Sequence, residues 1–274
     1  MLLVRRPAVA ADAERGQLVT ARFREPGEFC WINILTPRPA EARAFFAQLL
    51  GWTYAEIPGM GHTIAVDGRA VGGLFDLASP QTPPGTPPLI GAMLLVDSAD
   101  AAAARVTALG GSAMPPFDIG GQGRMAVCFD PNGAEFDVWE AGRHRGTDVD
   151  VRMHGAPSWF ENVSSNVATA AGFYTALFEW ETRLPPPGQA PPCTILRRGS
   201  TAVAGLAHAS AGPAGSRPHW RTYFTVDDVE TAARRAVELG GLVTSAPREI
   251  AGIGGACGLA SPEGVGFHAL SYRH

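Results

Sequence analysis

Residues 31–36, WINILT, followed by residues 40–52, AEARAFFAQLLGW, form a segment that the chain uses twice. The second copy reads WFENVS at residues 159–164 and ATAAGFYTALFEW at residues 168–180. The tryptophans at the two ends keep the same separation, because 159 − 31 and 180 − 52 both equal 128. A long pattern that returns in step indicates an internal duplication.

Three further blocks recur in the same order along the chain. AVGGLFD at 70–76 matches AVAGLAH at 202–208, MLLVDSADAAAARVTALGG at 93–111 matches YFTVDDVETAARRAVELGG at 223–241, and FDPNGAEFDVW at 129–139 matches ASPEGVGFHAL at 260–270. Matching blocks in one order predict two copies of one module in tandem. A length of 274 residues accommodates two modules of ordinary domain size.

The first half of each copy shows a strand followed by a helix. Residues 29–35 are largely apolar and β-branched, which predicts a strand. In the next segment, apolar residues recur three, four and seven positions apart, which predicts a helix that Gly51 ends in a left-handed C-cap. The apolar positions are Ala42, Phe45, Phe46, Leu49 and Leu50.

The second half of each copy repeats this order. A strand over 93–96 leads through Asp97 and Ser98, residue types that favour the N-cap position, into a helix predicted over 101–109. Residues 130–133, Asp-Pro-Asn-Gly, predict the turn of a closing hairpin. Each copy therefore reads as strand, helix and short strands, and then the same again.

This arrangement resembles the vicinal-oxygen-chelate (VOC) superfamily of glyoxalases, bleomycin-resistance proteins and dioxygenases. The residues that carry the resemblance are Phe45-Phe46, Leu50-Gly51-Trp52, the strand-to-helix junctions at Val96 and Val226, the Leu-Gly-Gly helix ends and the Asp-Pro-Asn-Gly hairpin. The resemblance implies an α+β fold of two tandem modules, each built of paired βαβββ units that form a half-barrel sheet with a concave pocket. The tryptophan-led first strands are similar to a tandem actinobacterial group described as glyoxalase-like or hydroxylase-like.

The repeat also sets the predicted domain boundaries. An N-terminal arm covers residues 1–26, the first module 27–141, a linker 142–156 and the second module 157–274. Because one module covers the sheet edges of the other, we expect a monomer with pseudo-two-fold symmetry, with a homodimer as the alternative.

Composition excludes several classes of function. Hydrophobic residues make up 46% of the chain and charged residues 18%, as in globular proteins. The net charge of −4 argues against a nucleic-acid partner, and no apolar run approaches the roughly 20 residues of a membrane span. Apolar residues 2–4 precede Arg5 and Arg6, which is the wrong order for an export signal, so a cytoplasmic protein is predicted.

The resemblance also implies where a metal would bind: at the start of a module's first strand, at the start of the central strand of its second half, and near the end of its last strand. The residues at these positions are Trp31, about Gly91, and Asp137 in the first module, and Trp159, about Arg221, and His268 in the second. Only Asp137 and His268 have side chains that ligate metals. No metal and no other cofactor is therefore predicted, and a divalent metal held between the modules is the alternative.

Polar residues in the second module suggest acid–base chemistry. Side chains alternate between the two faces of a strand, so Glu161 shares a face with Trp159, and Arg221 shares one with Tyr223. We expect Glu161, Arg221 and His268 to converge as a carboxylate, an oxyanion binder and a base that titrates near neutrality. Such a set suits proton abstraction beside a carbonyl. The alternative is a buried ion pair that only stabilises the half-barrel.

The corresponding face of the first module has less acid–base capacity. It carries Trp31, Asn33, Asp137 and Trp139, and we expect a binding or structural copy there. Trp31 and Trp159 are candidates to stack on a flat aromatic ligand, and the alternative is that both are core residues. His144 lies in the linker and is expected to have no role.

Two hypotheses about function follow. The first is a binding protein of the bleomycin-resistance type, which holds a small aromatic or natural-product ligand without turnover. The second is an enzyme of lyase, isomerase or dioxygenase type that uses Glu161, Arg221 and His268 or a composite metal site. The first is favoured because the usual metal-ligand positions are lost.

Overall fold

A computed structural model describes residues 21–80, 82, 85–184, 193–209 and 217–273. Most of the predicted N-terminal arm, residues 1–20, lies outside the described residues. Among the described helices, none is long and apolar enough to cross a membrane.

In the residues that the structure describes, the first module has two helices and nine strands in the predicted order. Its elements are β1 (Phe29–Thr36), α1 (Pro39–Leu50), β2 (Thr53–Ile57), β3 (Gly61–Val66), β4 (Arg69–Asp76), β5 (Leu89–Val96), α2 (Ala99–Ala108), β6 (Ser112–Ala113), β7 (Phe117–Asp118), β8 (Gly123–Phe129) and β9 (Glu135–Ala141). Helix α2 begins at Ala99, two residues earlier than predicted, because the Ser98 side chain caps it by accepting a hydrogen bond from Ala101 N.

The second module repeats this order. Its elements are β10 (Pro157–Ser164), α3 (Val167–Phe178), β11 (Glu181–Arg183), β12 (Thr194–Arg198), β13 (Thr201–His208), β14 (His219–Thr225), α4 (Val229–Glu238), β15 (Leu242–Ile250), β16 (Gly254–Ala260) and β17 (Gly266–Tyr272). The linker between the modules, residues 142–156, contains no helix or strand.

Each module forms one sheet, and the two halves of that sheet have similar strand arrangements outward from its centre. The strand order is β2-β3-β4-β1-β5-β9-β8-β6 in the first sheet, with β7 paired to β8, and β11-β12-β13-β10-β14-β17-β16-β15 in the second. At the centre, β1 runs parallel to β4 and antiparallel to β5, and β10 runs parallel to β13 and antiparallel to β14. The α+β fold of two tandem modules is therefore confirmed.

Helix α1 ends where the sequence indicates. Helix α1 begins with Pro39, which needs no hydrogen-bond partner at that position, and ends at Gly51 with a φ of 68°. Its buried side chains are the five predicted from the apolar spacing. The turn between β8 and β9 closes with a bond from Gly133 N to Asp130 O of 2.9 Å.

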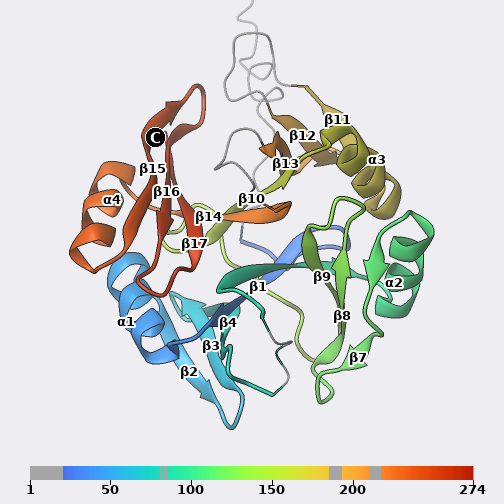
Figure 1. The fold of residues 1–274 in the computed structure, drawn as a ribbon, viewed down its shortest axis with the longest axis horizontal. Helices are drawn as coiled ribbons and strands as arrows, with labels where there is room; N and C mark the ends of the chain where they lie inside the picture. The colour runs from blue at the N-terminus through green and yellow to red at the C-terminus, as the bar shows by residue number, and fades with distance from the viewer. Residues whose placement is uncertain (1–20, 81, 83–84, 185–192, 210–216, 274) are drawn as a thin grey trace, which may run out of the picture.

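One apolar core serves both modules. The first module lies in the lower half of Figure 1 and the second in the upper half, with α1 beside α4 and α2 beside α3. The Phe29 and Phe160 rings stack across the boundary with centroids 4.0 Å apart. The indole of Trp52 donates to Gly155 O at 2.8 Å, so the repeated tryptophan anchors the linker. Because the core is shared, neither module buries its apolar face alone.

A buried polar network also joins the modules. The carboxylate of Asp130, from the first module, accepts hydrogen bonds from Tyr174 Oη at 3.1 Å and Asn162 Nδ2 at 3.2 Å, both from the second. Trp220 Nε1 donates to Tyr174 Oη at 2.9 Å. All four side chains are buried, so this network fixes how the two modules fit together.

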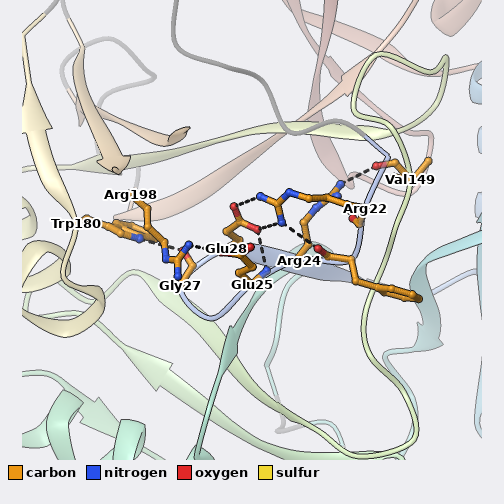
Figure 2. Close-up of polar contacts among 9 residues, drawn as sticks. Arg22, Arg24, Glu25, Gly27, Glu28, Val149, Trp180 and Arg198 are labelled. Atoms are coloured by element: carbon orange, nitrogen blue, oxygen red, sulfur yellow. Dashed lines mark hydrogen bonds and ion pairs between the residues drawn. The ribbon is translucent and has the colours of Figure 1, made fainter. Parts of the chain in front are cut away.

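The chain just before β1 packs against the linker, as Figure 2 shows. Arg22 donates to both oxygens of Glu28, at 2.6 and 2.8 Å, and only 2% of Glu28 is exposed. Arg24 is also buried and donates to Val149 O at 2.8 Å. The last residues of the predicted arm therefore tie the linker to the start of the first sheet.

Candidate functional site

Each sheet has one face that packs into the shared core and one that its helices do not cover. We call the helix-free face of β1, β5 and β9 trough 1 and that of β10, β14 and β17 trough 2. A separate apolar cluster lies in each, around Trp139 in trough 1 and around Tyr223 in trough 2. The candidate site residues lie on these two faces.

Strand register brings the predicted acid–base residues of the second module together. Glu161 on β10 lies opposite Arg221 on β14, and Tyr223 on β14 lies beside His268 on β17. Arg221 Nη1 and Tyr223 Oη both donate to Glu161 Oε2, each at 3.1 Å. Only 5% of Glu161 is exposed. The carboxylate is therefore held by a guanidinium and a phenol on the floor of trough 2.

The Tyr223 hydroxyl stays protonated and acts as a donor. Burial is the main cause that raises its pKa, and the negative charge of Glu161 raises it further. The charge of Glu161 is balanced by Arg221. The pair is thus neutral overall, and the remaining N–H groups of the guanidinium stay available as donors.

His268 completes the cluster as a neutral ring. Its imidazole lies 4.7 Å from the Tyr223 ring, and its buried Nδ1 has no hydrogen-bond partner among the described residues. Burial, followed by the positive charges of Arg221, His219 and Arg248, lowers the pKa of His268 to about 3. The expectation that His268 titrates near neutrality is therefore wrong: desolvation and the nearby arginines both disfavour the imidazolium.

A glycine on the neighbouring strand shapes the space beside His268. An ideal Cβ at Gly258 on β16 would lie 3.2 Å from His268 Nε2 and only 2.6 Å from the hydroxyls of Thr244 and Ser245. A side chain there would push these polar groups apart. No sequence signal singles out Gly258, because a glycine inside a strand does not reveal which side chains approach it.

Trough 1 holds a buried carboxyl at the position of His268. Asn33 on β1 lies opposite Gly91 on β5, and Asn33 Nδ2 donates to Asp137 Oδ2 at 3.4 Å. Only 6% of Asp137 is exposed. Burial, followed by the charge of Glu135, raises the pKa of Asp137 to about 7, while the Asn33 bond lowers it. Contrary to the expectation of a copy with less acid–base capacity, trough 1 holds the group that titrates near neutrality.

His144 belongs to trough 1, although its place in the linker gave it no predicted role. Its ring meets that of Trp31 edge-on with centroids 4.3 Å apart, and Trp139 Nε1 donates to His144 O at 2.9 Å. The linker doubles back after β9, so a residue outside the repeat reaches the aromatic side chains. No local pattern around His144 signals this return.

Trp31 and Trp159 line one small cavity between the modules, of about 40 Å³, together with Arg24 and Glu28. A space of that size holds a few water molecules. An aromatic ligand stacked between the two indoles would need the cavity to open. The structure therefore brings the two tryptophans together without a ready slot for a flat ring.

Comparisons with known proteins agree with this architecture. Residues 31–139 and 161–270 each match the model of the glyoxalase-like domain family. The chain belongs to that family. Its two glyoxalase-like domains coincide with the two modules and make it a tandem member of the VOC superfamily.

Two named relatives match nearly the whole chain. "Anthracycline biosynthesis protein DauV" from Streptomyces sp. (strain C5) is 34% identical over 272 residues, with 90% of this chain and 94% of the relative covered. "Putative glyoxylase CFP32" from Mycobacterium tuberculosis is 31% identical over 246 residues, with 88% and 93% covered.

Solved structures share the fold at low identity. A Mn(II)-bound glyoxalase from Novosphingobium aromaticivorans has a TM-score of 0.63 at 18% identity, with 90% of this chain and 82% of that chain covered. Homoprotocatechuate 2,3-dioxygenase from Brevibacterium fuscum has a TM-score of 0.63 at 11% identity, with 95% and 85% covered.

At the positions where the resemblance implies metal ligands, each glyoxalase-like module of this chain has one ligating side chain, Asp137 in the first and His268 in the second. Among the described residues, no group of three or more His, Cys, Asp or Glu side chains could hold a metal ion. In trough 2 the guanidinium of Arg221 occupies one of the three positions, and it already pairs with Glu161. In trough 1 the corresponding position is Gly91, which has no side chain to offer.

Proposed function

We propose that this glyoxalase-like protein binds a small organic molecule in trough 2 without a metal triad, and that the molecule carries a carbonyl or acidic oxygen. The observation that carries the proposal is the cluster of Glu161, Arg221, Tyr223 and His268 on one helix-free face. Arg221 uses one nitrogen for Glu161, and a guanidinium has five N–H donors. The donors left over match an oxygen-rich ligand.

The neutral histidine adds a ring to the same face. His268 contacts the ring of Tyr223, with centroids 4.7 Å apart. Trp159 and Tyr223 add aromatic surface beside the polar groups. A relative named as an anthracycline biosynthesis protein makes a polycyclic aromatic acid a reasonable first probe.

The first experiment measures metal content and binding on the same sample. Purified, untagged protein is analysed by plasma mass spectrometry with and without chelator, and is then titrated with a hydroxyanthraquinone carboxylic acid in a calorimeter. We expect far less than one metal ion per chain and saturable binding. Loss of a charge-assisted hydrogen bond in Arg221→Gln is expected to weaken binding about tenfold.

A matched control separates this effect from the loss of a positive charge. Arg234→Gln removes the same charge from an exposed position on α4 and is expected to bind like the wild type. Equal affinity in the two variants would contradict the proposal, and so would one tightly held divalent ion per chain.

One observation favours metal-independent catalysis as a second candidate function. Asp137, with its pKa near 7, is matched to general acid–base work at neutral pH, where a group must both accept and release a proton. Such an enzyme would move a proton beside a substrate carbonyl in trough 1. Conversion of a probe by the wild type, lost in Asp137→Asn while binding is retained, would support this candidate over simple binding.

A further inference from the structure

A second cavity lies where the linker meets the hairpin between β3 and β4, away from trough 2. It is an open depression of about 470 Å³, and the side chains of Arg143 and Arg145 at its edge are exposed. The residues that line it are Phe23, Gly68, Arg69, Ala70, Arg143, His144, Arg145, Gly146 and Asp148. The linker thus supplies most of a wall that neither module forms by itself.

The lining is basic in a chain that is acidic overall. Three arginines and one aspartate line the cavity, which leaves an excess of positive charge, whereas the whole chain has a net charge of −4. The aspartate, Asp148, already pairs with Arg69. Arg143 and Arg145 have no carboxylate partner among the described residues, so two guanidinium groups stay uncompensated beside one space.

Both free arginines are held in place without being neutralised. Arg145 lies over the ring of Phe23, with the guanidinium carbon 4.5 Å from the ring centroid. Arg143 lies against the turn between β7 and β8, with Nη2 3.4 Å from Gly120 O. An aromatic face and a backbone carbonyl restrict the two side chains but leave their charge in place. Restricted guanidinium groups lose less entropy when they bind an anion.

His144 also lines this cavity. Its Nε2 is buried and has no hydrogen-bond partner among the described residues. This atom is closed off from solvent, and the ring contacts Trp31 edge-on, so the cavity borders trough 1.

We propose that this cavity is a second ligand site, which binds a small organic anion through its carboxylate or phosphate group between Arg143 and Arg145. The planar guanidinium fork matches either group geometrically. This site goes beyond the proposed function, since it lies in the linker and the first module and uses none of the residues of trough 2.

The test uses the full chain and two defined probes, benzoate and inorganic phosphate, titrated separately in a calorimeter at low salt. We expect saturable binding of at least one probe, weakened about tenfold in Arg143→Gln and in Arg145→Gln and weakened by added salt. Arg234→Gln, with the same loss of charge on α4, is expected to bind like the wild type. Binding of benzoate but not phosphate identifies a carboxylate site, and the reverse identifies a phosphate site.

Either of two results would overturn the proposal: no saturable binding of either probe, or equal affinity in Arg143→Gln, Arg145→Gln and Arg234→Gln. Arg221→Gln keeps this result apart from the function proposed for trough 2. If the anion site is separate, Arg221→Gln retains a saturable site for the probes, and Arg143→Gln and Arg145→Gln weaken that site. If the probes bind in trough 2 instead, Arg221→Gln loses them and the two linker variants keep them.

Discussion

Troughs 1 and 2 have the same backbone and opposite chemistry. Asn33 lies opposite Gly91 in the first, and Glu161 lies opposite Arg221 in the second. In trough 2 the buried carboxylate therefore has a cation to pair with. In trough 1 the partner of the buried carboxyl of Asp137, among the described residues, is the Asn33 amide. The pairing of the strands fixes which side chains meet. The residue types at those positions then decide whether a buried charge has a partner.

The same physical cause shifts the pKa values of two corresponding groups in opposite directions, Asp137 on β9 and His268 on β17. Burial raises the pKa of Asp137 to about 7 and lowers that of His268 to about 3. In both cases desolvation favours the neutral form. The pKa of the carboxyl is thereby moved toward 7 and the pKa of the imidazole away from 7. The trough with fewer polar residues therefore holds the group that titrates near neutral pH.

The largest expected effect comes from removing the acid of the ion pair. Glu161→Ala leaves Arg221 without its carboxylate and Tyr223 without its acceptor, and should lower the free energy of unfolding by about 3–5 kcal/mol. Asn33→Ala removes one long hydrogen bond in trough 1 and should cost about 1 kcal/mol. Urea unfolding at pH 7.5 measures both.

Glu161→Gln serves as the control for shape, since it keeps the side chain length and an acceptor while removing the charge. Its loss in the free energy of unfolding should lie between those of Glu161→Ala and Asn33→Ala. Similar losses for Glu161→Ala and Asn33→Ala would mean that the ion pair contributes no more than the amide contact. The contrast between the troughs would then be one of composition only.

The next effect is a pH dependence from trough 1. An unfolded aspartate releases its proton near pH 3.8, whereas folded Asp137 keeps it to about pH 7. Folding therefore favours the protonated form. The stabilisation from Asp137 is fully present below pH 4 and is lost as the pH rises to 7. Above pH 7 the stability no longer changes with this group. Asp137→Asn should be more stable than the wild type at pH 8 by about 2–4 kcal/mol, with little of that gain at pH 4.

Thermal or urea unfolding at several pH values between 4 and 8 measures the difference between Asp137→Asn and the wild type. Asparagine keeps the size of the side chain, so the comparison isolates the proton. A difference that does not change with pH would show that Asp137 has an ordinary pKa and would remove the case for acid–base chemistry in trough 1.

The fold could be predicted from the sequence because its signals are local and repeated. The apolar stripe ending at Gly51 and the turn that begins at Asp130 mark helix and strand ends by themselves, and duplication shows each signal twice. Strand alternation also placed Glu161, Arg221 and Tyr223 on one face, where the structure has them.

The sequence could not predict how deeply a side chain is buried or where a segment folds back onto a distant part of the chain. The pKa values of Asp137 and His268 depend on how deeply each is buried, and neither neighbouring residues nor spacing encode that depth. His144 reaches Trp31 only because the linker folds back over the first module. The basic cavity beside it combines residues from three separate segments, so no single stretch of sequence marks it.

The smallest expected effect is the pH dependence from trough 2, which has the opposite sign. Unfolded histidine takes up a proton near pH 6.5, whereas folded His268 resists it until about pH 3. Its contribution to stability is therefore full above pH 6.5 and is lost as the pH falls toward 3. His268→Gln removes that titration, so its stability relative to the wild type should rise on acidification from pH 7 to 4. The change should be smaller than for Asp137, because His268 is partly exposed and water screens it. If His268→Gln and Asp137→Asn respond to pH in the same direction, burial does not control the two troughs in the way their geometry indicates.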